Sequence, residues 1–135
     1  MASASLKPGK ILVLDDEEDL REVVGLWLKR MGHEVELVAE GGKAAEIYGE
    51  AKRQGRPFDA VILDLTVKDG LGGREVLEAL LKIDPGVKAI VMSGYANDPA
   101  LLEPNRYGFK GVLTKPFDSD ALRETVSRVR KRNHP

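Results

Sequence analysis

The sequence predicts one α/β domain, with a parallel five-stranded sheet and helices packed on both of its faces. Short apolar runs alternate five times with segments of helical periodicity, which is the pattern of a parallel sheet with right-handed crossovers. The 135 residues, of which 42% are hydrophobic, suit a single packed core. We see no internal repeat and no sign of a second domain.

Each element has its own signal in the sequence. The run Ile11–Leu14 is apolar throughout, as in a strand buried on both faces. Apolar residues then recur at helical spacing from Leu20 to Met31, a stripe that includes Trp27, before Gly32 provides a stop. Glu34–Val38 alternates acidic and apolar residues, as an edge strand does. The remaining predicted elements are helix Lys43–Gln54, strand Ala60–Asp64, helix Gly73–Ile83, strand Val87–Met92, a short helix within Asp98–Glu103, strand Gly111–Thr114 and helix Asp118–Lys131.

The composition excludes several classes of function. The chain has no cysteine, which excludes disulfides and thiolate metal sites, and its two histidines, His33 and His134, cannot form a histidine-rich metal cluster. We expect His33 in a solvated turn. A net charge of −1 gives no global attraction to nucleic acid or anionic lipid. No apolar run approaches the roughly 18 residues of a membrane span, and Met1–Lys10 lacks the apolar stretch of a secretory signal. We therefore expect a cytoplasmic protein with no direct nucleic-acid or membrane partner.

Charged residues follow three of the predicted strands. Asp15 and Asp16 come after the first strand, Asp64 ends the third, and Lys115 follows the last. Ligands of open α/β sheets bind beyond the carboxyl ends of the strands, so these side chains should converge in one shallow pocket. Crowded carboxylates repel one another, so one of them should hold a raised pKa unless a hard cation such as Mg2+ is bound. The lysine adds a point charge that suits a phosphoryl group.

These motifs together resemble the receiver domains of two-component response regulators. The resemblance covers about Lys10 to Lys131 and rests on four motifs at strand ends, in the order Asp15-Asp16, Asp64, Ser93-Gly94 and Lys115-Pro116-Phe117. Each motif is weak alone, but their order and placement are specific. The segments that follow Asp64 and Ser93 look most like receivers attached to hybrid sensor histidine kinases.

The resemblance implies a fold, an activity and a set of site residues. The fold would be flavodoxin-like, a (βα)5 domain with strand order 2-1-3-4-5 at residues 10–132, between a flexible tail at 1–9 and a short tail at 133–135. Asp64 would accept a phosphoryl group from a histidine kinase or histidine phosphotransfer domain in a Mg2+-dependent reaction. Asp15, Asp16, Asp64 and the Thr66 carbonyl would hold Mg2+, whereas Lys115 and Ser93 would contact the phosphoryl oxygens. The Lys115–Pro116 peptide would be cis.

The same resemblance makes the protein a signalling phosphoacceptor, which catalyses only its own phosphorylation and dephosphorylation. Its output would pass through protein contacts, and a weak dimer is left open. Three positions depart from the commonest receiver pattern. Val112 stands where many receivers have a switch aromatic residue, Lys68 stands where the loop often has proline, and Pro104 interrupts the fourth helix. These departures concern the conformational output rather than the phosphorylation chemistry.

Two other classes of function compete with this reading. An aspartate-nucleophile phosphatase of the haloacid dehalogenase type needs a second aspartate two residues after its nucleophile. Glu17 and Thr66 occupy those positions after Asp15 and Asp64, so the fit is poor. A pseudo-receiver, which binds partners without being phosphorylated, is disfavoured by the complete set of acidic residues.

Overall fold

The structure is a computed structural model that describes residues 7–67 and 70–131. The elements within these residues are β1 (Lys10–Leu14), α1 (Glu18–Arg30), β2 (Glu34–Val38), α2 (Gly41–Arg53), β3 (Ala60–Asp64), α3 (Gly73–Ile83), β4 (Ala89–Ser93), α4 (Pro99–Leu102), α5 (Pro104–Tyr107), β5 (Gly111–Thr114) and α6 (Ser119–Lys131). Strands and helices alternate along the chain as the sequence predicted, except that two short helices stand between β4 and β5.

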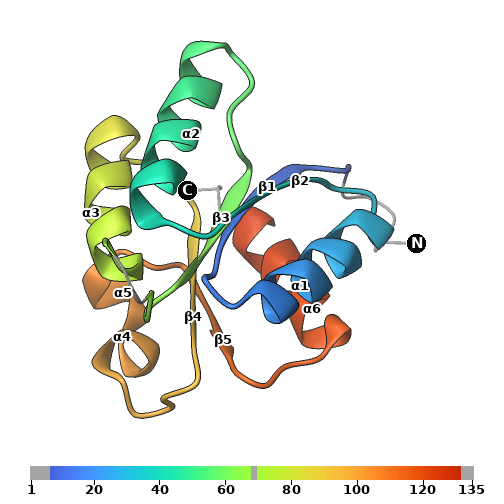
Figure 1. Ribbon diagram of the computed structural model, residues 1–135, viewed down its shortest axis with the longest axis vertical. Coiled ribbons are helices and arrows are strands. Elements are labelled where there is room, and N and C mark those ends of the chain that lie inside the picture. Colours follow the sequence, from blue (N-terminus) through green and yellow to red (C-terminus); the bar gives the residue numbers. More distant parts are fainter. Residues whose placement is uncertain (1–6, 68–69, 132–135) are drawn as a thin grey trace.

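The five strands form one parallel sheet in the order β2-β1-β3-β4-β5. Helices α1 and α6 cover one face, and α2 and α3 cover the other (Figure 1). The edge strand β2 pairs only with β1 and alternates exposed with less exposed residues, as its sequence predicted. The predicted flavodoxin-like topology is therefore confirmed. Because every pair is parallel, all five strands present their carboxyl ends at the same edge of the sheet.

The core consists of two apolar layers separated by the sheet. Strands β3 and β4 are buried along their whole length, and β1 is buried from Ile11 onward. Successive side chains of a strand point to opposite faces, so Leu12 and Leu14 join the layer under α2 and α3, whereas Ile11 and Val13 join the layer under α1 and α6. Burial on both faces explains why these strands read as continuous apolar runs.

Trp27, which belongs to the apolar stripe of α1, lies at the rim of the core. It is half-buried and packs edge-on against Phe117, with the ring centroids 6.4 Å apart and the ring planes at 61°. Phe117 lies in the turn between β5 and α6. The ring pair therefore joins α1 to the segment that follows the fifth strand, close to Lys115 in the sequence.

The segment between β4 and β5 is more helical than the sequence predicted. The short helix expected within Asp98–Glu103 is present as α4, but a second turn, α5, begins directly at Pro104. Proline pushes the preceding residue away from helical dihedrals, and Glu103 has φ −133° and ψ 66°. Proline is itself well suited to the first position of a helix, so it ends one turn and starts the next. Gly108, with φ 97°, ends α5 in the left-handed conformation.

Few side chains anchor this segment to the core. Ala100 and Leu101 are buried, whereas Leu102 is 65% exposed. Val112, at the position where many receivers have an aromatic residue, is half-buried against the layer under α2 and α3. The departure at Lys68 lies outside the described residues.

Two element boundaries differ from the prediction for local reasons. Helix α2 begins at Gly41 rather than Lys43, although glycine is a poor helix former. A Cβ atom at Gly41 would overlap the carbonyl oxygen of Leu71, so only glycine allows this approach to the loop after β3. Strand β4 begins at Ala89 rather than Val87, because the Val87 N–H donates to the carbonyl of Asp84 in a turn.

The segment before β1 is attached to the domain by hydrogen bonds. The Gly9 N–H donates to His33 Nδ1 at 2.9 Å, and the Arg130 guanidinium donates to the carbonyl of Lys7 at 2.7 Å. His33 is therefore half-buried rather than in a solvated turn, and burial lowers its pKa below the ordinary value.

The predicted domain limits remain predictions, because residues 1–6 and 132–135 lie outside the described part of the chain. Within the described residues, no helix combines the length and the apolar character that a membrane crossing requires.

Candidate phosphorylation site

The predicted site residues converge at the carboxyl edge of the sheet. Asp15 follows β1, Asp64 ends β3, Ser93 ends β4, and Lys115 follows β5 directly. Asp15, Asp64 and Ser93 are buried, with residue exposures of 0%, 2% and 1%. The pocket above them is lined by Asp16, Glu17, Asp64, Thr66, Gly94, Tyr95 and Lys115. Every site residue named from the sequence therefore lies in this pocket or directly beneath it.

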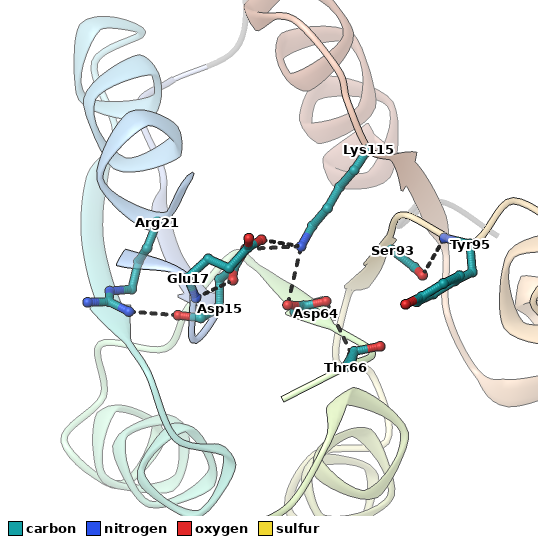
Figure 2. A network of polar contacts seen from close by, with 8 residues as sticks. All are labelled: Asp15, Glu17, Arg21, Asp64, Thr66, Ser93, Tyr95 and Lys115. Atoms are coloured by element: carbon teal, nitrogen blue, oxygen red, sulfur yellow. Dashed lines mark hydrogen bonds and ion pairs between the residues drawn. The ribbon is translucent and has the colours of Figure 1, made fainter. Parts of the chain in front are cut away.

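Lys115 lies at the centre of the acidic groups. Its ammonium nitrogen is 3.4 Å from Asp15 Oδ2, 3.3 Å from Asp64 Oδ2 and 3.3 Å from Glu17 Oε1 (Figure 2). The lysine side chain is 19% exposed, so it extends into the pocket from the end of β5 rather than into solvent. The Lys115–Pro116 peptide is cis, as the resemblance implied.

Hydrogen bonds fix the loop between β1 and α1. Asp15 Oδ1 accepts a hydrogen bond from the Glu17 N–H at 2.8 Å, and the Arg21 guanidinium donates to the Asp15 carbonyl at 2.8 Å. Figure 2 shows Arg21 on the far side of this loop from Lys115. These contacts leave Asp15 Oδ2 facing the lysine and place the Glu17 side chain beside the pocket.

Burial and charge act on Asp64 in opposite directions. Burial raises the pKa of Asp64 to about 6, the nearby Lys115 ammonium opposes this, and repulsion from Asp15 adds to it. The raised pKa was expected from the crowding of three carboxylates. The structure assigns the larger part to burial, because the Asp64 side chain is only 2% exposed.

Lys115 responds differently to the same neighbours. Burial acts to lower the pKa of Lys115, but attraction from Asp64 and Asp15 exceeds it, so the pKa is raised above the ordinary value. The two results agree physically, since one ammonium is shared by three carboxylates. The three carboxylates all stabilise the charged form of Lys115, whereas Asp64 shares this one ammonium with Asp15 and Glu17.

The carboxylates form a set that fits a divalent cation. Asp15, Asp16 and Asp64 each offer an oxygen, and these oxygens lie within 4.8 Å of one another. Asp15 Oδ2 is buried and accepts no hydrogen bond from the described residues, although the Lys115 ammonium lies 3.4 Å away as an ion-pair partner. Carboxylate and carbonyl oxygens are the ligands that Mg2+ prefers. Thr66 lies in the same pocket, and its N–H donates to Asp64 Oδ1 at 3.2 Å.

Ser93 and Tyr95 form the side of the pocket opposite Asp15. Ser93 Oγ accepts a hydrogen bond from the Tyr95 N–H at 3.0 Å, which fixes the turn after β4. Tyr95 is 65% exposed and lines the pocket. The hydroxyl predicted to contact a phosphoryl group is thus present on the same side of the site as Thr66 (Figure 2).

A family model described as the response regulator receiver domain matches residues 11–127. The chain belongs to the response regulator receiver domain family. Members of this family are signalling phosphoacceptors rather than conventional enzymes, and they interact with histidine kinases or phosphotransfer proteins. The matched range extends from β1 into α6 and includes every predicted site residue.

Two curated relatives are similar to this receiver over most of both chains. The chemotaxis protein CheY of Thermotoga maritima is 29% identical over 123 residues, which cover 90% of this chain and 98% of that protein. The sporulation initiation phosphotransferase F of Bacillus subtilis is 29% identical over 119 residues, which cover 88% of this chain and 91% of that protein.

One larger relative and one solved structure are also similar to this chain. The chain spans 28% of the length of the transcriptional regulatory protein GlrR of Escherichia coli, to which it is 28% identical over 131 residues. A response regulator receiver protein from Sinorhizobium medicae has a structure with a TM-score of 0.78 and 30% identity, covering 96% of this chain and all 100% of that one. The predicted likeness to receivers of hybrid kinases stays a prediction.

Glu17 is the site residue whose role the sequence did not reveal. It was considered only as a mismatch to a phosphatase motif, yet its carboxylate contacts the ammonium of Lys115. Its position directly after the Asp15-Asp16 pair was the one available signal. Whether an exposed loop side chain turns toward the pocket depends on loop dihedrals and hydrogen bonds, which residue spacing does not fix.

Proposed function

We propose that this receiver accepts a phosphoryl group on Asp64 from a phosphohistidine of a histidine kinase or histidine phosphotransfer domain. The observation that carries the proposal is the position of Asp64, whose carboxylate lies 3.3 Å from the Lys115 ammonium and within 4.8 Å of the Asp15 and Asp16 oxygens. A carboxylate nucleophile beside concentrated positive charge suits phosphoryl transfer. The resemblance to receiver domains also implies that Asp64 is the phosphoacceptor.

Phosphoryl transfer to Asp64 exchanges one bond to phosphorus for another. An Asp64 oxygen attacks phosphorus, a P–O bond forms as the P–N bond to the donor imidazole breaks, and the imidazole nitrogen leaves with the electron pair and takes a proton from solvent. The Lys115 ammonium stabilises negative charge on the transferring oxygens, and Ser93 donates a hydrogen bond to one of them. Water later attacks the acyl phosphate, which releases inorganic phosphate and restores the carboxylate.

The proposed metal is Mg2+, held by Asp15, Asp16, Asp64 and the carbonyl of Thr66. Bound there, Mg2+ would supply positive charge to the phosphoryl oxygens and relieve repulsion among the carboxylates. The buried Asp15 Oδ2, which accepts no hydrogen bond from the described residues, and the all-oxygen ligand set support this choice. The downstream output is proposed to pass through protein contacts, and the cytoplasmic location and weak dimer stay predictions.

Intact-protein mass spectrometry tests the proposal directly. Incubation with acetyl phosphate should add one phosphoryl group when Mg2+ is present and none when Mg2+ is chelated. Asp64→Asn should abolish the addition. Asp120→Asn removes an acid on α6 whose side chain is 86% exposed and should react like the wild type. Full labelling of the Asp64→Asn variant would show that another residue is the acceptor.

A further inference from the structure

The Lys115 ammonium lies among the same carboxylates that would bind a metal, so it must move when a metal binds. Lys115 Nζ lies 3.4 Å from Asp15 Oδ2 and 3.3 Å from Asp64 Oδ2. Both residues belong to the set of three aspartates that fits a divalent cation. In the structure, the lysine therefore acts as a tethered cation for the same carboxylates, and a metal must compete with it for them.

The contact of Lys115 with Glu17 differs from its contacts with the two aspartates, because Glu17 lies outside the metal set. Glu17 Oε1 lies 3.3 Å from the ammonium, but Glu17 is not one of the three residues whose oxygens lie within 4.8 Å of one another. Its side chain is 66% exposed, whereas those of Asp15 and Asp64 are 0% and 2% exposed. Glu17 is thus a solvated carboxylate at the border of the pocket, within reach of the lysine and outside the metal set.

We propose that Glu17 is a positioning residue that holds the Lys115 ammonium when a divalent cation takes the lysine's place among the aspartates. The inference rests on the proposed metal site and adds a role for a residue outside it. The lysine keeps one carboxylate partner as it withdraws from Asp15 and Asp64. Its ammonium thereby stays beside the pocket, where a phosphoryl group on Asp64 would need it.

The local backbone supports this role. The Glu17 N–H donates to Asp15 Oδ1 at 2.8 Å, and Glu17 precedes the first turn of α1 with extended dihedrals, φ −83° and ψ 110°. The base of the side chain is therefore fixed relative to a metal ligand, while its carboxylate is free to follow the lysine. Glu18, the next residue, carries the same charge, but its carboxylate is not among the three that contact Lys115.

A double-mutant cycle on Mg2+ affinity tests the role, with the dissociation constant measured by titration calorimetry. Lys115→Met should tighten Mg2+ binding by about tenfold, because it removes the tethered competitor. Glu17→Gln alone should weaken Mg2+ binding by about two- to fivefold, the effect of losing a half-exposed ion pair, since Lys115 then remains longer on the aspartates. In the Lys115→Met background, Glu17→Gln should have no more effect than Glu18→Gln.

Glu18→Gln is the matched control, because it removes the same charge from the adjacent residue. An equal weakening of Mg2+ binding by Glu17→Gln and Glu18→Gln in the wild-type background would mean that the loss of any nearby negative charge has this effect. That result refutes the role of Glu17. An equal effect of Glu17→Gln with and without Lys115 refutes it as well. If the wild-type protein shows no saturable Mg2+ binding at all, the proposed metal site fails, which is a separate outcome.

A second measurement covers the case in which Lys115→Met does not fold. The Lys115 ammonium can be observed by nitrogen-15 NMR in the wild type and in Glu17→Gln during a Mg2+ titration. With Mg2+, the ammonium should remain rotationally restricted in the wild type and become freely rotating in Glu17→Gln. The same freedom in both proteins would overturn the inference.

Discussion

Neutralising Asp64 should stabilise the metal-free fold. The pKa of this carboxyl is raised from 3.8 to about 6, with burial as the main cause. A shift of about two units corresponds to about 3 kcal/mol of cost for keeping the carboxylate ionised above pH 6. Asp64→Asn removes that cost, but its amide has one acceptor atom and cannot accept from both the Lys115 ammonium and the Thr66 N–H, which offsets about 1 kcal/mol. We expect a net gain of about 2 kcal/mol at pH 7.5.

The sign of the pH dependence follows from the direction of the shift. A group with a raised pKa in the fold costs nothing below pH 3.8, where it is protonated in both folded and unfolded chains, and its cost grows as pH rises through about 6. The gain from Asp64→Asn should therefore be present at pH 7.5 and absent at pH 3.5. Urea unfolding followed by circular dichroism, with a chelator present, measures both values. Asp120→Asn serves as the exposed control and should change stability by less than about 0.5 kcal/mol.

Adding Mg2+ should act against the stability gain of Asp64→Asn. An ion that binds only the folded state stabilises it in proportion to the logarithm of its concentration over Kd. Asp64→Asn removes one of the residues proposed to coordinate Mg2+. The wild type should therefore gain more from millimolar Mg2+ than the variant does. If the metal-free variant is no more stable than the wild type at pH 7.5, then Lys115 already compensates the buried charge and the reasoning is wrong.

Three further predictions concern other parts of the molecule. Asp16→Ala should weaken Mg2+ binding about tenfold or more, as loss of a ligand, without lowering the metal-free melting temperature; a large fall would mean that Asp16 is structural. Beryllofluoride, a phosphoryl mimic, should increase hydrogen-exchange protection between Tyr95 and Tyr107, because this segment has few buried anchors; high protection that the mimic leaves unchanged would contradict this. The His33 pKa is lowered from 6.5 by burial and by Arg130, so its contribution to stability is complete above pH 6.5 and is lost as pH falls below it. Wild type and His33→Gln should therefore converge in urea stability toward low pH, and a constant difference would exclude the buried histidine as the cause.

The sequence was sufficient to predict that the candidate side chains converge, because the fold does most of the positioning. Asp15, Asp64 and Lys115 are far apart in the chain, but each stands at the end of an apolar run. A parallel sheet brings such ends together whatever the details of the loops. The pattern of apolar runs therefore predicted both the sheet and the place where the charged side chains meet.

Features that depend on loop conformation were not predicted. The contact of Glu17 with Lys115 arises from a loop held by Asp15 and Arg21, and the second turn α5 arises because Pro104 both ends and begins a helix. The early start of α2 reflects the approach of Gly41 to Leu71, which is a contact between segments distant in sequence. Such details depend on dihedral angles and tertiary neighbours, which periodicity does not encode.

The packing of Trp27 on Phe117 gives the protein a built-in optical probe. The chain has a single tryptophan, so its emission arises from one place, the contact between α1 and the turn after Lys115. Phe117 is two residues beyond that lysine, so a change in the lysine's backbone that moves this ring alters the surroundings of the indole. A binding event at the pocket that moves Phe117 can then be followed by intrinsic fluorescence in the unmodified protein, without a dye and without an added aromatic residue.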